Sequence, residues 1–335
     1  MKTFIHSMPK VELHLHIEGT LEPELMFALA KRNAIAIPFK SDEEIKAAYN
    51  FHNLQSFLDI YYQGANVLIH EQDFFDLTWA YLLRCQTDNV LHTEIFFDPQ
   101  THTARGVSFD TVINGIDSAL VKGRAELNIS SKLIMCFLRH LDEASAFDTL
   151  AQAMHHQDKI IAVGLDSSEL GNPVEKFARV FEAAKASGFK AVAHAGEEGP
   201  ASNIVNALQV LQVERVDHGV RCTDDQHLVA KLAAEQTPLT VCPLSNIKLK
   251  VFQHMSQHNI VDLLRQGVCV TINSDDPAYF GGYMTDNFLA VMEAHPMSRA
   301  EITQFTINAI NASFISLQEK ANFLKITGDY LEQNQ

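Results

Sequence analysis

The sequence predicts an α/β fold, a (β/α)8 TIM barrel that forms a single domain over residues 1–335. Eight short apolar runs rich in β-branched residues alternate with longer stretches of helical periodicity, and most of the runs end in polar or Gly/Pro-containing turns. No linker rich in Pro, Ser or Gly divides the chain. Such alternation is typical of a closed parallel barrel. The predicted strands are 11–17, 91–97, 132–138, 160–165, 190–195, 214–218, 238–242 and 268–273.

The interval between the first two predicted strands is longer than one crossover helix requires. Residues 20–89 contain several helical patterns, and they follow the C-terminal end of the first strand, where barrel active sites lie. We therefore expect a helical insertion after the first strand that forms a lid, although an ordinary helix core would show the same pattern. Its apolar ridge, at near-helical spacing, comprises Phe51, Leu54, Phe57, Leu58, Tyr61 and Tyr62.

The composition limits the classes of partner. The chain carries 41 acidic and 26 basic residues, a formal charge of -15, so its field should repel nucleic acid and anionic membranes. A phosphorylated substrate is disfavoured for the same reason, and a neutral small molecule fits better. Five scattered cysteines without a C-x-x-C pair indicate reduced thiols and a cytoplasmic protein. No signal core or membrane-spanning stretch is predicted. The oligomeric state is left open.

The first strand carries two histidines with a spacing of two. His14 and His16 lie in Val11-Glu12-Leu13-His14-Leu15-His16, and period-two alternation places both imidazoles on one side of the strand. In a barrel, that side is the interior. Two inward imidazoles near a strand end are costly to bury unless something binds their nitrogens. The pair therefore indicates a metal site.

The ends of the fifth and eighth strands supply two further potential ligands, His194 and Asp275. In a closed barrel the first and eighth strands are neighbours and the fifth lies across the mouth, so these groups can converge with His14 and His16 on one ion. Three imidazoles and one carboxylate suit a single Zn²⁺ with an open position for water. Iron, manganese or cobalt would satisfy the same ligands.

Three other polar residues at strand ends could handle the substrate and its protons. Glu197 follows a predicted ligand by three residues and could donate a proton, while His218, which ends the sixth strand, could accept one from water. A helix-start carboxylate and a residue that merely supports the metal ligands are the structural alternatives. Asp276 should point away from Asp275 and be free to bind substrate, or else simply form the turn before Pro277.

Taken together, the motifs resemble the adenosine and adenine deaminase family of the metal-dependent hydrolase superfamily. The resemblance implies hydrolytic removal of the 6-amino group of a purine at a zinc-activated water. It further implies that Glu197 protonates ring N1, that His218 assists the water, that Asp276 bonds N7 and that the backbone of Gly164 contacts N3. The matching pieces, in family order, are His14-Leu-His16, Gly164-Leu165-Asp166, His194-Ala-Gly-Glu197, His218-Gly219, Cys242-Pro243-Leu244-Ser245-Asn246 and Ser274-Asp275-Asp276-Pro277.

Within this family the sequence favours a free purine base, adenine, over a nucleoside. Where adenosine deaminases typically read His-Leu-Asp-Gly, this chain has Glu18, whose longer side chain could occupy the space of a ribose. The segments Asp166-Ser167-Ser168-Glu169 and 278–283 also resemble the versions found in base deaminases. Adenosine and N6-substituted adenines remain alternative substrates.

Two readings outside the family are also open. A binuclear amidohydrolase would share the first strand, but it needs a bridging group, commonly a modified Lys, after the fourth strand, and that strand ends Gly164-Leu165-Asp166. A non-catalytic purine-binding protein could keep the same fold, because fold alone does not determine function. The joint presence of ligands, proton donor and assisting histidine argues against it.

Overall fold

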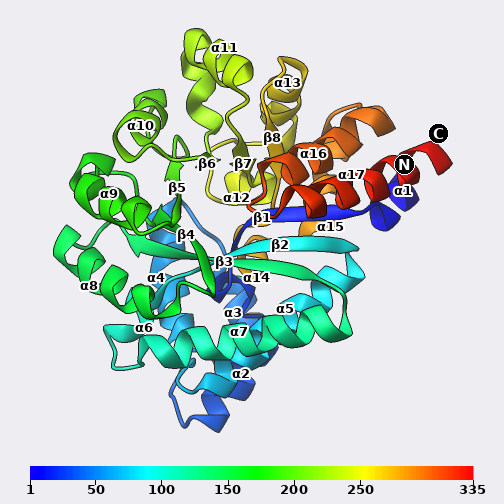
Figure 1. The fold of residues 1–335 in the computed structure, drawn as a ribbon. Coiled ribbons are helices and arrows are strands. Elements are labelled where there is room, and N and C mark those ends of the chain that lie inside the picture. Colours follow the sequence, from blue (N-terminus) through cyan, green and yellow to red (C-terminus); the bar gives the residue numbers. More distant parts are fainter. Residues whose placement is uncertain (335) are drawn as a thin grey trace.

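A computed structural model describes residues 1–334, and its centre is a barrel of eight parallel strands in the order β1 to β8 (Figure 1). All eight strands lie within two residues of the predicted ranges, and the barrel prediction is confirmed. The strands are β1 (Lys10–His16), β2 (Val90–Phe97), β3 (Ser130–Leu138), β4 (Ile160–Asp166), β5 (Lys190–Ala195), β6 (Arg215–His218), β7 (Leu239–Val241) and β8 (Val270–Ile272).

The barrel closes between β1 and the residues just after β8. Asp275 forms a parallel bridge with Leu15: its N–H donates to the carbonyl of His14 at 3.1 Å, and its carbonyl accepts from the N–H of His16 at 3.0 Å. The side chain of Asn273 adds a hydrogen bond from the N–H of Leu13, at 2.8 Å. A predicted metal ligand, Asp275, is thus held by the barrel backbone itself.

Helices follow the strands and surround the barrel (Figure 1). Local sequence sets several of their starts: Ser298 Oγ accepts from the N–H of Glu301 at 3.2 Å, and the Glu301 carboxylate accepts from the N–H of Ser298 at 2.8 Å. The helices outside residues 20–89 are α1 (Lys2–Ser7), α6 (Pro99–Thr103), α7 (Phe109–Glu126), α8 (Glu143–Ala153), α9 (Ala178–Ala186), α10 (Ala201–Asn206), α11 (Gln226–Glu235), α12 (Pro243–Lys248), α13 (Ile260–Arg265), α14 (Pro277–Phe280), α15 (Met284–Ala294), α16 (Arg299–Ala312) and α17 (Leu317–Gln333).

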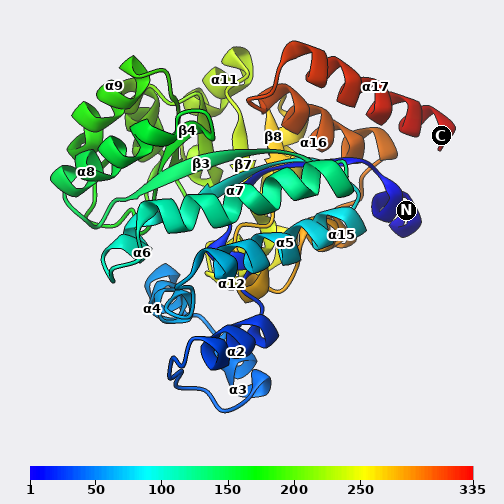
Figure 2. The ribbon, with the colours of Figure 1, turned by 60° about the horizontal axis from the view of Figure 1, so that its bottom comes forward.

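Residues 20–89 form helices, as their periodicity predicts: α2 (Pro23–Arg32), α3 (Asp42–Ala48), α4 (Leu54–Ala65) and α5 (Glu71–Thr87). Figure 2 shows α5 beside α7, whereas α2, α3 and α4 project from one side of the barrel. α4 begins with Asn53, whose side chain accepts from the N–H of Ser56 at 3.0 Å. The helix buries one face, which contains most of the predicted apolar ridge.

At the N-terminal end of the barrel, a buried ion pair between Arg215 of β6 and Glu94 of β2 crosses the interior. Arg215 also donates to the carbonyls of Leu13 and Ala312, and its guanidinium stacks on the Phe314 ring. These contacts tie three strands to the segment between α16 and α17. They form a structural polar core at the opposite end from the predicted active site.

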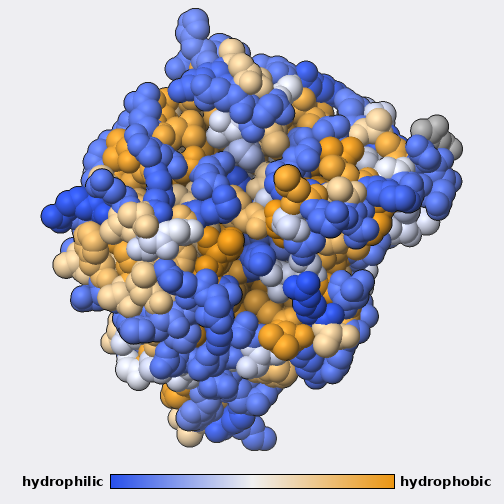
Figure 3. Space-filling model, in the orientation of Figure 1, coloured by the Kyte–Doolittle hydropathy of each residue, from blue (hydrophilic) through white to orange (hydrophobic). Residues whose placement is uncertain are grey.

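The outer surface agrees with the acidic composition. Figure 3 shows hydrophilic side chains over most of one face, with smaller apolar areas between them. Among residues 1–334, no helix combines the length and apolar character needed to cross a membrane. All five cysteines are buried and unpaired.

Candidate active site

Three non-glycine residues that follow or end strands have left-handed backbone conformations. Ser167 after β4, His218 at the end of β6 and Asp275 after β8 have φ values of 71°, 63° and 63°. A bulky or charged residue adopts this region only where the surrounding structure holds it there, and such residues cluster at functional sites. All three line one cavity at the C-terminal ends of the strands.

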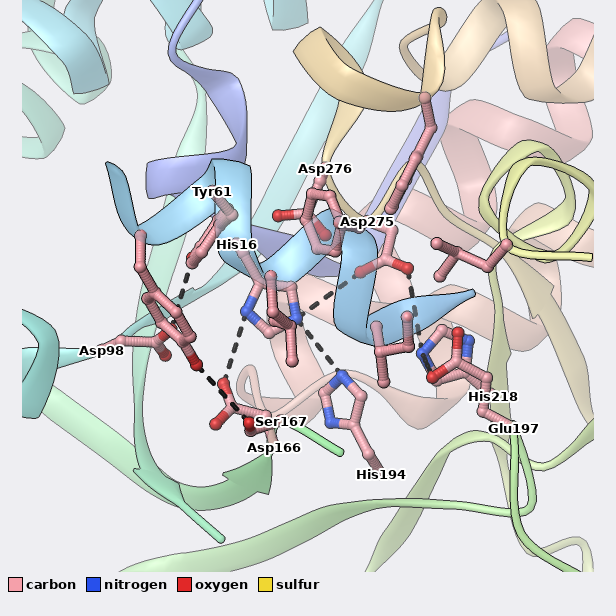
Figure 4. A pocket seen from close by; sticks show the side chains of 16 residues that line it. His16, Tyr61, Asp98, Asp166, Ser167, His194, Glu197, His218, Asp275 and Asp276 are labelled. Carbon is pink, nitrogen blue, oxygen red and sulfur yellow. Dashed lines mark hydrogen bonds and ion pairs between the residues drawn. The ribbon is translucent and has the colours of Figure 1, made fainter. Parts of the chain in front are cut away.

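Three of the four predicted metal ligands, His16, His194 and Asp275, line this cavity (Figure 4). His14 Nε2 lies 3.2 Å from Asp275 Oδ1, while His16 Nε2 lies 3.2 Å from His194 Nε2 and 3.5 Å from Asp275 Oδ1. One ligand atom each from His14, His194, His218 and Asp275 also lie within 4.8 Å of one another. The structure therefore brings the four predicted residues together and adds His218 to the same cluster.

The unsatisfied atoms of this cluster fit a bound cation. The side chains of His14 and His194 are almost fully buried, and His14 Nε2 has no hydrogen-bond partner. The facing Nε2 atoms of His16 and His194 can both be satisfied only by a proton or a cation between them. A donor set of imidazole nitrogens and one carboxylate, without thiolate, suits a divalent transition metal such as zinc.

Asp217, next to His218 in the chain, orients two of the imidazoles from behind. Its Oδ2 lies 3.6 Å from Nδ1 of His194, and its Oδ1 lies 3.9 Å from Nδ1 of His14 and accepts a hydrogen bond from the Thr240 hydroxyl at 2.7 Å. The Thr240 carbonyl lies 3.2 Å from His14 Nδ1. His14 Nδ1 is thus engaged by Thr240, which leaves its Nε2 to face the cluster, whereas His194 Nδ1 has the Asp217 carboxylate nearby but no hydrogen-bond partner.

Glu197 is placed as a proton donor to a bound molecule. Its side chain is buried and lines the cavity, and its Oε1 has no hydrogen-bond partner. Burial, together with the nearby Asp275 carboxylate, raises the pKa of Glu197 well above its usual range, which favours the protonated form of the carboxyl group.

The loop that carries Glu197 is held by a second carboxylate, Glu169. Glu169 accepts hydrogen bonds from four consecutive backbone N–H groups, those of Gly196 (3.0 Å), Glu197 (2.8 Å), Glu198 (3.1 Å) and Gly199 (3.3 Å). A further bond comes from the Asn203 amide at 2.7 Å. Such a nest of N–H groups on one carboxylate restrains the loop, and with it the proton donor.

His218 lies between the proton donor and the metal cluster. Its Nε2 is 3.6 Å from Glu197 Oε2 and 3.8 Å from Asp275 Oδ2. Burial lowers the pKa of His218 to about 3, so the ring is neutral at physiological pH. A neutral imidazole in this position can accept a proton or hydrogen-bond a water molecule.

The second carboxyl after β8, Asp276, also lines the cavity and does not point away from Asp275, because one oxygen of each carboxyl and one nitrogen of His16 lie within 4.8 Å of one another. Its close approach requires Gly19, because a Cβ at that glycine would lie 2.0 Å from Asp276 Oδ1. Burial and the adjacent Asp275 raise the pKa of Asp276 well above its usual range. The group can therefore donate a hydrogen bond to a ligand acceptor.

Residues 9–328 match the profile of the family described as adenosine deaminase. The chain belongs to this family. The match runs from the residue before β1 into α17, so it includes every strand and every residue of the cluster. The family predicted from the motifs is confirmed.

Relatives within and around the adenosine deaminase family share the whole length of the chain. An adenine deaminase of Vibrio parahaemolyticus is 64% identical over 334 residues, which cover 100% of this chain and 99% of that protein. The crystal structure of adenine deaminase from Arthrobacter aurescens superposes with a TM-score of 0.96 at 48% identity, covering 97% of this chain and 100% of that one. An amidohydrolase from Burkholderia ambifaria, with bound Zn, has a TM-score of 0.90 at 25% identity, covering 99% and 93%.

Two residues predicted to contact substrate do not line the cavity. Gly164 lies within β4, where an added Cβ would meet Cys136 Sγ at 2.5 Å, and the cavity wall at this strand consists of Asp166 and Ser167 instead. Glu18 is buried beside the cavity, where its Oε1 accepts hydrogen bonds from His102 Nε2 at 2.8 Å and from a backbone N–H at 3.2 Å. The second oxygen of Glu18, Oε2, is buried without a hydrogen-bond partner.

The sequence alone assigned no role to three buried carboxyls of the site: Asp98, Asp166 and Asp217. Asp98 follows β2 directly and Asp166 ends β4, and both line the cavity. A signal was present, because polar residues at the C-terminal ends of barrel strands are candidates for function. The apolar wall facing them consists mainly of α4, with lining residues Leu54, Phe57, Leu58, Tyr61 and Tyr62.

Proposed function

We propose that the protein is a metal-dependent deaminase that converts adenine and water into hypoxanthine and ammonia. The observation that carries this proposal is the convergence of the His/Asp cluster with the buried carboxyl group of Glu197 at one cavity. Support for adenine comes from full-length relatives that are named adenine deaminases, one of them at 64% identity. In the reaction the C6–O bond forms, the C6–N bond breaks, and the amino group leaves as ammonia. We further propose a role in purine salvage in the cytoplasm.

His14, His16, His194 and Asp275 would hold one Zn²⁺ per chain. The Zn-bound relative from Burkholderia ambifaria supports this choice of metal. When bound, zinc lowers the pKa of a coordinated water so that the water becomes a nucleophile near neutral pH. His218 then has either of two roles, as a further ligand or as the group that accepts the water proton, and its neutral ring suits both.

The side chains of the chain itself orient and activate the purine. Glu197 donates its proton to ring N1, which makes C6 electron-poor and open to attack by water. Asp276 in its protonated form donates to N7, an acceptor in adenine, and so fixes the orientation of the ring. The apolar side chains of α4 cover the flat face of the purine and exclude bulk water.

We also propose that residues 1–335 act as one domain in which 20–89 is the lid of the site. α4 contributes five cavity-lining residues, and Phe57 packs on Phe280 from the segment after β8, with ring centroids 4.7 Å apart. A purine must enter past this apolar wall, so α4 has to move away from Phe280 for substrate exchange.

The proposal is tested by a panel of adenine, adenosine, AMP and N6-methyladenine with the purified, zinc-loaded protein. Loss of the 6-amino chromophore and release of ammonia or amine are followed for each compound. We expect kcat/KM to be highest for adenine. Faster turnover of adenosine or of N6-methyladenine would replace adenine as the substrate, and no turnover of any compound would favour a binding protein. Elemental analysis should find one zinc per chain, whereas two metals would favour a binuclear hydrolase.

A further inference from the structure

A second cluster of buried carboxyls lies beside the metal cluster, on the other side of His16 (Figure 4). Asp98 follows β2 and Asp166 ends β4, and both side chains are about 2% exposed. His16 Nδ1 lies 3.5 Å from Asp166 Oδ2. One ligand atom from each of these three residues lies within 4.8 Å of the other two.

Three of the four carboxyl oxygens of this pair have no hydrogen-bond partner in the described part of the chain. Asp98 Oδ1 and Asp166 Oδ1 have no hydrogen-bond partner, and the only hydroxyl donor to Asp98 in the described part of the chain is Tyr61, at 3.3 Å. Among residues 1–334, no Lys or Arg forms an ion pair with either carboxyl. Because burying an acceptor without a donor costs free energy, such a pair points to a donor that arrives with a ligand.

Both carboxyls line the cavity, so the ligand they meet is the molecule bound there. Free adenine carries one ring N–H donor, N9–H, and this edge lies across the ring system from C6. In the proposed orientation N1 faces Glu197 and N7 faces Asp276, which leaves N3 and N9–H for the remaining polar wall. Figure 4 shows Glu197 and the carboxyl pair on opposite sides of His16, as this orientation requires.

We propose that Asp98 and Asp166 accept the N9–H donor of the free base and thereby select the base over N9-substituted purines. This inference rests on the proposed function. A nucleoside has carbon in place of this hydrogen, so it would bury the pair without a donor and bring the ribose against it. Sites built to bond a substrate N–H or O–H reject analogues that lack it by as much as about 10⁴–10⁵-fold.

Glu18 supports the pair from behind, in a role different from direct steric exclusion. Its Oε1 accepts from the backbone N–H of Asp98 at 3.2 Å and from His102 Nε2 at 2.8 Å, and it thereby anchors the start of the segment after β2. The motif that contains Glu18 predicts a preference for the free base. In this proposal Glu18 contributes to that preference by holding Asp98 in position.

The test compares adenine with 9-methyladenine, which differs by replacement of N9–H with N9–CH3. Asp98→Asn keeps the size of the side chain and alters its hydrogen bonding, and Asp98→Ala removes the carboxyl. Asp98 is preferred to Asp166 because it does not touch a proposed metal ligand directly. Asp59→Asn, on the exposed side of α4, is the control for loss of one negative charge. Circular dichroism and zinc content verify that each variant is folded and loaded.

We expect Asp98→Asn to lower kcat/KM for adenine by roughly tenfold or more, and Asp98→Ala by more, because a hydrogen bond to a charged or buried group is lost. The value for 9-methyladenine should change by less than about threefold, since that compound makes no N9–H contact. The preference for adenine over 9-methyladenine therefore falls in both variants and stays unchanged in Asp59→Asn. An equal loss for both compounds would mean a structural role for Asp98 and would overturn the proposal.

Two further outcomes separate this inference from the proposed function. If the wild-type protein deaminates neither compound, the proposed function fails, and calorimetric binding of adenine and 9-methyladenine to wild type and Asp98→Asn still measures the contact. If the wild type binds a second metal that Asp98→Asn loses, the pair is a cation site with His16, and the recognition of N9–H is refuted.

Discussion

Glu197 has a carboxyl group whose pKa is raised well above its usual range, and its side chain lines the cavity. Glu197→Gln keeps the size of the side chain but removes its acidic proton. We expect kcat for adenine to fall by about 10²–10⁴-fold, the usual contribution of a positioned general acid, with little change in hypoxanthine affinity. Steady-state kinetics and product-binding calorimetry measure both quantities.

The same variant should retain its zinc, because Glu197 is outside the proposed ligand set. Asp224, an exposed carboxyl in the turn after β6 that does not line the cavity, provides a control as Asp224→Asn, which should keep wild-type kinetics. Full activity in Glu197→Gln would remove Glu197 from the mechanism.

Asp217 acts on metal binding through the imidazoles that it orients. Asp217→Asn leaves His14 and His194 in place but weakens the acceptor behind their Nδ1 atoms, at 3.9 and 3.6 Å. We expect zinc affinity to fall by about 10–100-fold, which competition with a chelator measures directly. Activity at saturating zinc should recover in large part. Unchanged affinity would show that Thr240 alone fixes the ring orientation.

At the scale of elements, α4 is the part of the proposed lid that lines the cavity. It lies in the long connection between β1 and β2 and contacts the cavity mainly through apolar and aromatic side chains. Bound hypoxanthine should therefore slow amide hydrogen exchange in residues 54–65 by roughly tenfold or more, while α16 on the barrel wall changes little. Mass spectrometry of exchange with and without hypoxanthine makes this comparison. Equal protection of α4 in both states would mean that it is a fixed wall.

At the scale of the whole molecule, the two ends of the barrel have different roles. The Glu94–Arg215 pair at the N-terminal end touches no cavity residue but links distant strands. Glu94→Gln leaves the buried guanidinium without its counter-charge, so we expect a loss of about 3–5 kcal/mol in the free energy of unfolding. Activity per folded molecule should stay near that of the wild type. Urea denaturation and kinetics on the same samples separate the two effects.

This pair also predicts how stability depends on pH. Burial raises the pKa of Glu94, but the attraction of Arg215 outweighs it and lowers the pKa from 4.5 to about 2. A carboxyl with a depressed folded-state pKa stabilises the protein above its unfolded value, so a contribution of about 3 kcal/mol is present above pH 4.5 and is lost as the pH falls toward 2. The stability difference between wild type and Glu94→Gln should shrink over that interval. A constant difference would contradict the assignment.

The sequence alone determined the features that depend on local pattern. The eight strands follow from short apolar runs, and the orientation of His14 and His16 follows from the two-residue period of a strand. His194 and Asp275 were predictable because parallel strands in a barrel present their C-terminal ends at one mouth. The order of the motifs was sufficient to predict the family, which the profile match confirms.

Only the tertiary structure decided which buried groups share an environment. The proximity of Asp98 to Asp166 depends on the register and twist of β2, β3 and β4, and neither carboxyl has a local sequence partner. Gly164 and Glu18 belong to the matching motifs, yet neither is among the residues that line the cavity. The contacts that define this environment are a few ångströms long, whereas the residues that make them are tens to hundreds of positions apart in the chain. A local sequence pattern therefore predicts strands and the faces of their side chains, but only the folded chain determines which buried groups meet.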